Sequence, residues 1–391
     1  MILEGKNMQV EIIENVDYGK VARILYESYI PQWEIAGSPE WSAEYVEYLD
    51  KTYIKPRGGP CVGAFDGEDL VGIGFGYIND WNVTELGKIS TMALSNCGVL
   101  PQYQRKGIAV SIVNKLEEIA ASNEIGLLYR ICNEELNDYR VLIKCGFTEK
   151  IDNAYQMARI LGSDMVNKAA MFKEYGAIMK QLVKTVAGLP KDRIQRGSIR
   201  DGEPADTGAC IKVLESYKDS TPLMREWTEE EFEKSISNAD LLAGTPFTPF
   251  FRVWEVDEAI KAFVIGRIEF IRWRKGTCPS GIIADTGFAN DLDKKDKTSF
   301  VASIILELKE KAPEAFATNL AVAHHEEKAF DKAGFNNDRS KRPLFVKAIG
   351  NELKEWAQRD WKYKTYYISY LRWNFIQSPF FNSISFFISE K

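Results

Sequence analysis

The chain has 391 residues, of which 45% are apolar, and a formal net charge of −6. This length predicts two ordinary domains, and the acidic balance argues against a nucleic-acid binder, which normally carries a basic face. The six cysteines are scattered without a C-x-x-C pair, and no apolar run approaches the length of a membrane span. We therefore expect reduced thiols, no membrane contact and a cytoplasmic location.

The elements of the first half alternate between apolar patterns of period 2 and period 3.6. A strand that begins at Met8 is followed by two helices, a β-hairpin, a long strand, a helix, a strand, a helix that ends in Gly-Phe and a last strand. The clearest of these are the hairpin over 61–78, the strand over 90–100, the helix from 108 and the strands over 127–132 and 155–161.

The second half repeats the first. "ILYESY" at 24–29 returns as "KVLESY" at 212–217, and "IKCGF" at 143–147 returns as "DKAGF" at 331–335, both at an offset of 188. The hairpin also recurs in the second half, between these two segments. Three repeated segments in the same order predict two copies of one α/β unit. The predicted parts are a first domain over 8–160, a helical linker over 161–192, a second domain over 193–350 and a helical, aromatic tail over 351–391.

An abrupt turn joins the long strand of the first copy to the next helix. Gly107 stands where that helix begins, and a residue without Cβ lets a ligand approach the backbone closely. The first amides of a helix have no intrahelical acceptor and carry the positive end of its dipole. The turn therefore suits a phosphate or pyrophosphate, and Arg105 and Lys106 would add positive charge.

The residues of this turn, "QRKGIA" at 104–109, fit the pattern Q/R-x-x-G-x-G/A. They resemble the acyl-CoA pyrophosphate loop of the GNAT superfamily of N-acyltransferases, and the order of the surrounding elements is also that of the family. The resemblance implies an α/β (α+β) chain of two tandem GNAT-like domains, each a mixed, mostly antiparallel sheet flanked by helices. It also implies acetyl-CoA as co-substrate, no metal, and direct acyl transfer to a primary amine.

The resemblance assigns the cofactor-binding residues. The backbone of Val99 and Leu100 would line the pantetheine arm, with the Val99 amide polarising the thioester carbonyl. Asn137 resembles the asparagine of the family that contacts pantetheine, and Asn133 is its rival. The pyrophosphate loop consists of Gln104, Arg105, Lys106, Gly107, Ile108 and Ala109.

The catalytic residues of the family are not all present. Many members have a tyrosine acid four residues before the glycine of Gly-Phe, but here Leu142 occupies that position. Tyr139 could replace it or could be a packing aromatic. The central strand lacks a carboxylate, so Glu85 and Asp80 are candidate bases acting through water. Cys97 has no histidine in this half to make it a nucleophile.

The second copy departs further from the pattern. Its loop reads "DLDKKDKTSF" at 291–300, which has no glycine and contains three aspartates that should repel a pyrophosphate. We expect a degenerate, cofactor-free domain that serves packing, dimerisation or the acceptor site. His324 and His325 are adjacent in sequence and do not converge, so we predict no metal site.

The segment 29–53 is expected to build the acceptor pocket. Ser38 and Pro39 resemble the N-cap and first residue of an amphipathic helix. Trp33 and Glu34 would receive a cationic amine by cation–π contact and ion pairing.

The function predicted first is an acetyl-CoA-dependent N-acetyltransferase for a small-molecule or peptide amine. Its main rival is a non-catalytic acyl-CoA-binding regulatory or interaction protein, and a purely structural assembly is a third reading. No nucleic acid or membrane is expected as a partner, and a homodimer is left open.

Overall fold

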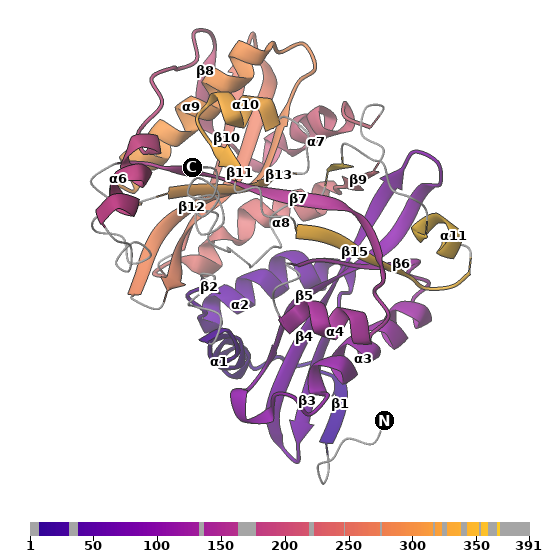
Figure 1. Ribbon diagram of the computed structural model, residues 1–391. Coiled ribbons are helices and arrows are strands. Elements are labelled where there is room, and N and C mark those ends of the chain that lie inside the picture. The colour runs from indigo at the N-terminus through magenta and orange to yellow at the C-terminus, as the bar shows by residue number, and fades with distance from the viewer. Residues whose placement is uncertain are drawn as a thin grey trace.

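A computed structural model of the chain has one β-sheet that runs through both halves of the molecule, with helices packed against it (Figure 1). The structure describes residues 8–30, 38–132, 137–162, 177–218, 223–245, 247–273, 276–315, 317–322, 327–337, 342–351, 353–358 and 366–367.

The first half supplies the elements drawn in indigo to magenta in Figure 1. They are β1 (Met8–Ile12), α1 (Tyr18–Tyr29), β2 (Ser38–Pro39), α2 (Ala43–Leu49), a π-helical turn (Asp50–Ile54), a 3-10 turn (Lys55–Arg57), β3 (Cys61–Asp66), β4 (Asp69–Val83), β5 (Gly87–Val99), a 3-10 turn (Pro101–Tyr103), α3 (Ile108–Ser122), β6 (Leu127–Ile131), α4 (Asn137–Lys144) and β7 (Glu149–Ile160).

The second half supplies the remaining elements. They are α6 (Ala177–Val186), β8 (Ser198–Asp201), a 3-10 turn (Pro204–Asp206), α7 (Thr207–Glu215), β9 (Leu223–Glu226), α8 (Glu229–Ser237), a 3-10 turn (Asn238–Leu242), β10 (Thr248–Val256), β11 (Ala259–Trp273), β12 (Gly276–Phe288), α9 (Lys294–Lys311), β13 (Ala317–Val322), α10 (Glu327–Lys332), β14 (Asn336–Asn337), β15 (Arg342–Ala348), α11 (Lys354–Ala357) and β16 (Tyr366–Tyr367).

Matching strands confirm the fold expected from the sequence repeat. β4 and β11 each have 15 residues and begin at 69 and 259, an offset of 259 − 69 = 190. β5 and β12 each have 13 residues and begin at 87 and 276, an offset of 276 − 87 = 189. Within each copy these two strands pair antiparallel, β4 with β5 and β11 with β12, and each pair follows a hairpin, β3–β4 or β10–β11. Each copy thus has the mixed, mostly antiparallel sheet that was predicted.

The two copies exchange strands. The main path of the sheet runs β1-β3-β4-β5-β6-β15-β7-β13-β12-β11-β10-β8, so β15 of the second copy lies beside β6 of the first. β7 of the first copy lies beside β13 of the second, and Figure 1 shows it crossing toward that half. The predicted boundary after residue 160 separates two sequence repeats, but it does not separate two sheets. Local sequence patterns predict strands and do not reveal which copy each strand joins.

The acceptor segment begins differently from the prediction. Ser38 and Pro39 do not start a helix, because they form β2 and pair with β11 of the second copy. The helix starts later, at α2, where Ser42 Oγ accepts a hydrogen bond of 3.2 Å from the Tyr45 amide. Pairing with a strand far away in sequence therefore overrides the local N-cap signal.

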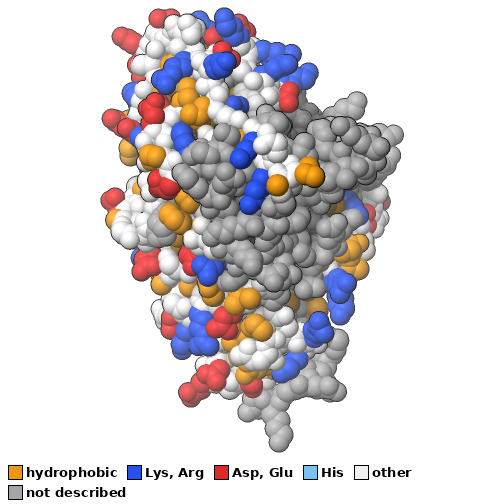
Figure 2. Space-filling model, turned by 60° about the vertical axis from the view of Figure 1, so that its left-hand side comes forward, with side chains coloured by type: hydrophobic (Ala, Val, Ile, Leu, Met, Phe, Trp, Pro, Cys, Tyr) orange, Lys and Arg blue, Asp and Glu red, His pale blue; other side chains and the backbone are white. Residues whose placement is uncertain are grey.

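The surface carries charges of both signs. On the face that Figure 2 shows, basic and acidic side chains are interspersed over the part of the chain that the structure describes. No described helix is long and apolar enough to span a membrane.

Candidate functional site

A cavity of about 590 Å³ lies between the C-terminal part of β5 and helices α1, α3 and α4. Its lining includes five of the six predicted loop residues and residues from elements that are distant in sequence. The residues are Ser28, Tyr29, Leu94, Cys97, Gly98, Val99, Tyr103, Gln104, Arg105, Gly107, Ile108, Ala109, Val110, Val113, Arg130, Asp138, Arg140, Val141, Leu142 and Lys144.

The cavity forms where two parallel strands separate. β5 pairs with β6 from Thr91 to Ala93, and no described pairing between them continues beyond that point. The guanidinium of Arg130 spans the opening, because Nη1 donates to the Leu94 carbonyl at 2.7 Å and Nη2 donates to Asp138 Oδ2 at 2.5 Å. The ion pair thus holds the two strands and α4 around the cavity.

The end of β5 presents backbone groups to this opening. The Leu100 amide donates to the Val71 carbonyl of β4 at 3.0 Å. Because successive residues of a strand direct their amides to opposite edges, the Val99 amide points away from β4, toward the cavity side. Gln104 Nε2 donates to the Val99 carbonyl at 3.0 Å and so fixes the start of the loop.

The loop leads into an uncapped helix. Arg105 and Gly107 have φ angles of 63° and 83°, and Gly107 is the N-cap of the 15-residue helix α3 without a side-chain hydrogen bond to its first turn. The first amides of α3 therefore remain available for an external acceptor. Arg105 and Lys106 are exposed, and Lys106 Nζ lies 4.9 Å from the centre of the Tyr103 ring. These features fit a pyrophosphate.

The corresponding helix of the second copy is closed by its own carboxylates. Asp293 Oδ1 accepts a hydrogen bond of 2.8 Å from the Asp296 amide at the start of α9. Asp296 also pairs with Arg196, and Asp291 pairs with Lys261. A pyrophosphate there would meet carboxylates in the position where α3 offers free amides, which supports the expectation of a cofactor-free second copy.

The predicted catalytic residues do not line the cavity. Tyr139 packs with its ring centre 5.5 Å from that of Phe345, on β15. Glu85 lies in the exposed turn between β4 and β5, at the end of β5 opposite to Val99. Asp80, the other candidate base, pairs with Arg57 and Lys88. The geometry therefore does not support an acid or base role for these residues.

Several other predicted site residues lie partly or wholly outside the described part of the structure. Asn137 is the first residue of α4, and its side chain lies outside the described part of the structure. Trp33, Glu34 and Asn133 also lie outside the described residues. The backbone of Leu100 continues β5 into the loop, as expected.

Among the cavity residues that the sequence did not single out, Tyr29, Arg130 and Asp138 form polar contacts in its wall. The Tyr29 hydroxyl donates to the Cys97 carbonyl at 3.4 Å, and burial raises the pKa of Tyr29. Burial by itself would lower the pKa of Arg130, but the carboxylate of Asp138 contributes to a net rise. These residues come from α1, β6 and α4, and no motif links them, although Tyr29 ends one of the repeated segments.

Cys97 lies in the same wall. Burial raises the pKa of its thiol to about 12. At neutral pH the side chain is therefore a thiol, which is a poor nucleophile. This agrees with the prediction that Cys97 has no nucleophilic role.

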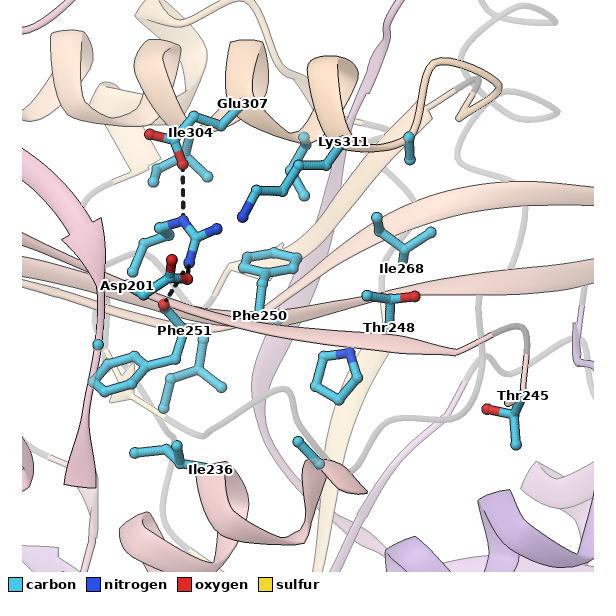
Figure 3. A pocket seen from close by; sticks show the side chains of 18 of the residues that line it. Asp201, Ile236, Thr245, Thr248, Phe250, Phe251, Ile268, Ile304, Glu307 and Lys311 are labelled. Atoms are coloured by element: carbon cyan, nitrogen blue, oxygen red, sulfur yellow. Dashed lines mark hydrogen bonds and ion pairs between the residues drawn. The ribbon is translucent and has the colours of Figure 1, made fainter. Parts of the chain in front are cut away.

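A second cavity, of about 440 Å³, lies between β10, β11 and the C-terminal end of α9 (Figure 3). Arg252 crosses it, paired with Asp201 and with Glu307, whose Oε2 lies 2.9 Å from Arg252 Nε. Figure 3 shows Lys311 reaching from α9 over the ring of Phe250. This cavity mixes charges of both signs and lies away from the N-terminus of α9, so it lacks the features of the first one.

No group of three or more potential metal ligands occurs among the described residues. The histidines at 324 and 325 lie outside them.

Residues 22–147 match a family model described as the acetyltransferase (GNAT) family. This match contains the cavity wall from Ser28 to Lys144 and the whole 104–109 loop. No curated protein matches the chain in a sequence comparison.

Solved structures share the fold over most of the chain. Saccharomyces cerevisiae N-myristoyltransferase with bound myristoyl-CoA has a TM-score of 0.69 and 13% identity, covering 88% of this chain and 83% of its own. A tandem GNAT protein from the clavulanic acid biosynthesis pathway has a TM-score of 0.58 and 12% identity, covering 88% of this chain and 100% of its own. A probable N-acyltransferase from Enterococcus faecalis has a TM-score of 0.54 and 11% identity, covering 88% and 73%.

At these identities the solved structures establish the fold, whereas the family model establishes the kind of domain. Residues 22–147 are an acyltransferase domain of the GNAT superfamily, and the whole chain has the fold of a tandem GNAT protein.

Proposed function

We propose that the first copy is an acetyl-CoA-dependent N-acetyltransferase that moves the acyl group from the CoA thioester directly to a primary amine. The observation that carries this proposal is the uncapped N-terminus of α3 at one end of the cavity in the first copy. The equivalent terminus of α9 is capped by Asp293. A working acyl-CoA site is therefore proposed in the first copy alone.

Each part of the cavity has a role in this proposal. The amides of residues 105–109 bind the pyrophosphate, and Arg105 and Lys106 add attraction for its charge. The pantetheine arm follows the opening between β5 and β6. The Val99 amide donates to the thioester carbonyl and stabilises the oxyanion that forms when the amine attacks.

The reaction itself requires little further chemistry. The neutral amine nitrogen bonds to the thioester carbon, the C–S bond breaks, and the proton lost by the amine passes to the departing thiolate, so that an amide and free CoA thiol form. Because a thiolate is only weakly basic, its departure needs little assistance. Arg130, held by Asp138 in the cavity wall, supplies positive charge near the separating strands. The amine is held next to the thioester, which lowers the barrier by proximity.

The relatives support acyl transfer, because one neighbour in fold is an N-myristoyltransferase with bound myristoyl-CoA and another is a probable N-acyltransferase. A cationic amine recognised by Trp33 and Glu34 remains our proposal for the acceptor class. Small-molecule and peptide amines both remain candidates.

Isothermal titration of acetyl-CoA into the full chain tests the cofactor site. We expect one site per chain, and Gly107→Glu should abolish it by placing a carboxylate and a strained backbone at the pyrophosphate amides. Gly87→Glu is the matched control, because Gly87 also has a positive φ, of 74°, but begins β5 at the end away from Val99 and does not line the cavity. Two sites, or binding that survives Gly107→Glu, would contradict the proposal.

The second candidate function is a non-catalytic acyl-CoA-binding regulatory protein. It is favoured by the absence of Tyr139 and Glu85 from the cavity lining. Release of free CoA thiol from acetyl-CoA in the presence of polyamines, amino sugars or basic peptides separates the two candidates. A sensor binds acetyl-CoA without turnover, whereas the proposed enzyme releases CoA with at least one of these amines.

A further inference from the structure

Stacked aromatic rings lie behind the end of the cavity that is remote from the pyrophosphate loop. Trp41 stacks on Tyr29 with ring centroids 6.0 Å apart, and Phe247 stacks on Tyr45 at 4.0 Å. Trp41 and Tyr45 join the two pairs at 5.7 Å with their planes tilted by 44°, and we call the four rings the aromatic stack. Of these four rings only Tyr29 lines the cavity. All four are buried: Tyr29 is 2% exposed, Trp41 6%, Tyr45 0% and Phe247 2%.

The helix that carries Tyr29 also packs tightly on the strand beside it. A Cβ added to Gly98 of β5 would lie 2.7 Å from Ser28 Oγ and 3.3 Å from a methyl group of Leu25. Such contacts leave no passage between α1 and β5 at this point. A chain that extends from the thioester therefore meets the face of α1 rather than a gap beneath it.

Polar groups also lie in the wall at this end. Arg130 and Asp138 form their ion pair there, and the Tyr29 hydroxyl points to the Cys97 carbonyl. Arg130 and Tyr29 are buried, at 7% and 2% exposed, and already bond to groups of the protein. A long alkyl chain could displace them only by leaving buried polar atoms unpaired, which is unfavourable.

We propose, building on the function proposed above, that the stack of Tyr29, Trp41, Tyr45 and Phe247 limits the length of the acyl chain that the site accepts. The donor class is then short-chain acyl-CoA, such as acetyl-CoA or propionyl-CoA, and octanoyl-CoA and longer donors are excluded. The fold alone does not fix this limit, since a neighbour with the same fold binds myristoyl-CoA.

The stack also gives the second copy a part in the selectivity of the first. Phe247 lies just before β10 of the second copy, and its ring is parallel to that of Tyr45 within 2°. Tyr45 OH additionally donates to Glu269 of β11 at 3.2 Å. The wall that closes the acyl end is thus supported from behind by the degenerate copy.

The test measures the binding of acetyl-, butyryl-, octanoyl- and myristoyl-CoA to the full chain by isothermal titration, below the concentrations at which the long donors form micelles. All four share the CoA moiety, so differences report on the acyl end. We expect octanoyl-CoA to bind at least tenfold more weakly than acetyl-CoA. Equal affinity for acetyl- and octanoyl-CoA in the unsubstituted protein would overturn the proposal without any variant.

Two variants then locate the limit. Tyr29→Ala removes the ring at the cavity and should bring the affinity for octanoyl-CoA to within threefold of that for acetyl-CoA. Tyr53→Ala is the matched control, because Tyr53 is also 2% exposed but does not line the cavity. An equal relaxation in both variants would show a general loss of packing and would overturn the assignment to Tyr29.

Failure of every donor, acetyl-CoA included, to bind would overturn the proposed function and this inference together. Tight binding of acetyl-CoA without discrimination by chain length overturns the inference alone.

Discussion

Single side chains decide which atoms face the cavity. Arg130 is the clearest case, because its guanidinium replaces the backbone pairing that β5 and β6 lose beyond Ala93. A buried arginine needs such partners, since its charge is costly to remove from water. Asp138 supplies the countercharge from the first turn of α4, where a carboxylate also interacts favourably with the helix dipole.

The thiol of Cys97 gives a prediction for the route of transfer. Because its pKa is raised to about 12, it cannot act as a thiolate nucleophile at neutral pH. Cys97→Ala should release CoA within about threefold of the unsubstituted rate, since direct transfer uses no cysteine. Mass spectrometry of the protein incubated with acetyl-CoA alone should show no acyl adduct, and a labile adduct lost in Cys97→Ala would reject direct transfer.

Helix termini distinguish the two copies at the scale of secondary-structure elements. α3 and α9 follow matching strands, yet one begins at a glycine and the other at an aspartate whose side chain caps the helix. The first arrangement keeps amides available for a ligand, and the second uses them for stability. One element of the repeat has thus been adapted to two purposes.

Removal of the cap on α9 should cost stability without creating a binding site. Asp293→Ala should lower the free energy of unfolding by about 0.5–2 kcal/mol, the usual effect of losing an N-cap. Acetyl-CoA titration should still give one site per chain, since Asp291 and Asp296 remain at that terminus. A second acetyl-CoA site in this variant would mean that the Asp293 cap alone prevents the second copy from binding acetyl-CoA.

The turn that precedes α7 predicts a pH dependence. Two hydrogen bonds from Arg200, of 2.7 and 2.9 Å, lower the pKa of Asp206. The ionised form is thus favoured by folding, and its contribution is present above the unfolded pKa of about 3.9 and lost as the pH falls through the folded pKa. Asp206→Asn should be less stable than the unsubstituted protein in urea at pH 7, with a difference that narrows toward pH 3. An equal difference in the free energy of unfolding at pH 7 and pH 3 would refute the assignment of this stabilisation to the ionised carboxylate of Asp206.

At the scale of the molecule, exchanged strands and buried charges join the two copies. Besides β15 and β7, the short strand β9 of the second copy pairs with β4 of the first. Next to that pairing, Glu231 accepts hydrogen bonds from Tyr77 at 2.9 Å, Arg57 at 2.9 Å and Arg225 at 3.1 Å. The junction is therefore part of the core rather than a hinge between independent domains.

Loss of the carboxylate at this junction should be strongly destabilising. Glu231→Ala leaves Arg225, which is 1% exposed, without its countercharge and should lower the free energy of unfolding by about 3–5 kcal/mol. Glu230→Ala is the control, because Glu230 pairs with Lys234 on the same helix and its side chain is 68% exposed; it should change the free energy of unfolding by less than about 0.5 kcal/mol. Similar urea midpoints for the two variants would argue against a structural role for the cluster.

The sequence by itself determined the local features of this protein. Apolar periodicity predicted the helix from residue 108, which is α3 and buries Ile108, Ile112 and Leu116. The sequence repeat predicted two copies of one unit. The loop at 104–109 could be recognised because a phosphate site on a helix terminus is contiguous in sequence. Backbone geometry, rather than a distant side chain, forms such a site.

Only the tertiary structure decided which side chains meet. Tyr29, Arg130 and Asp138 converge from three elements, and the stack that ends at Phe247 spans both copies. The exchange of strands between the copies and the pairing of Ser38 and Pro39 with β11 were also decided by the tertiary structure. Periodicity reports which face of an element is buried, but the partner of that face depends on the path of the whole chain.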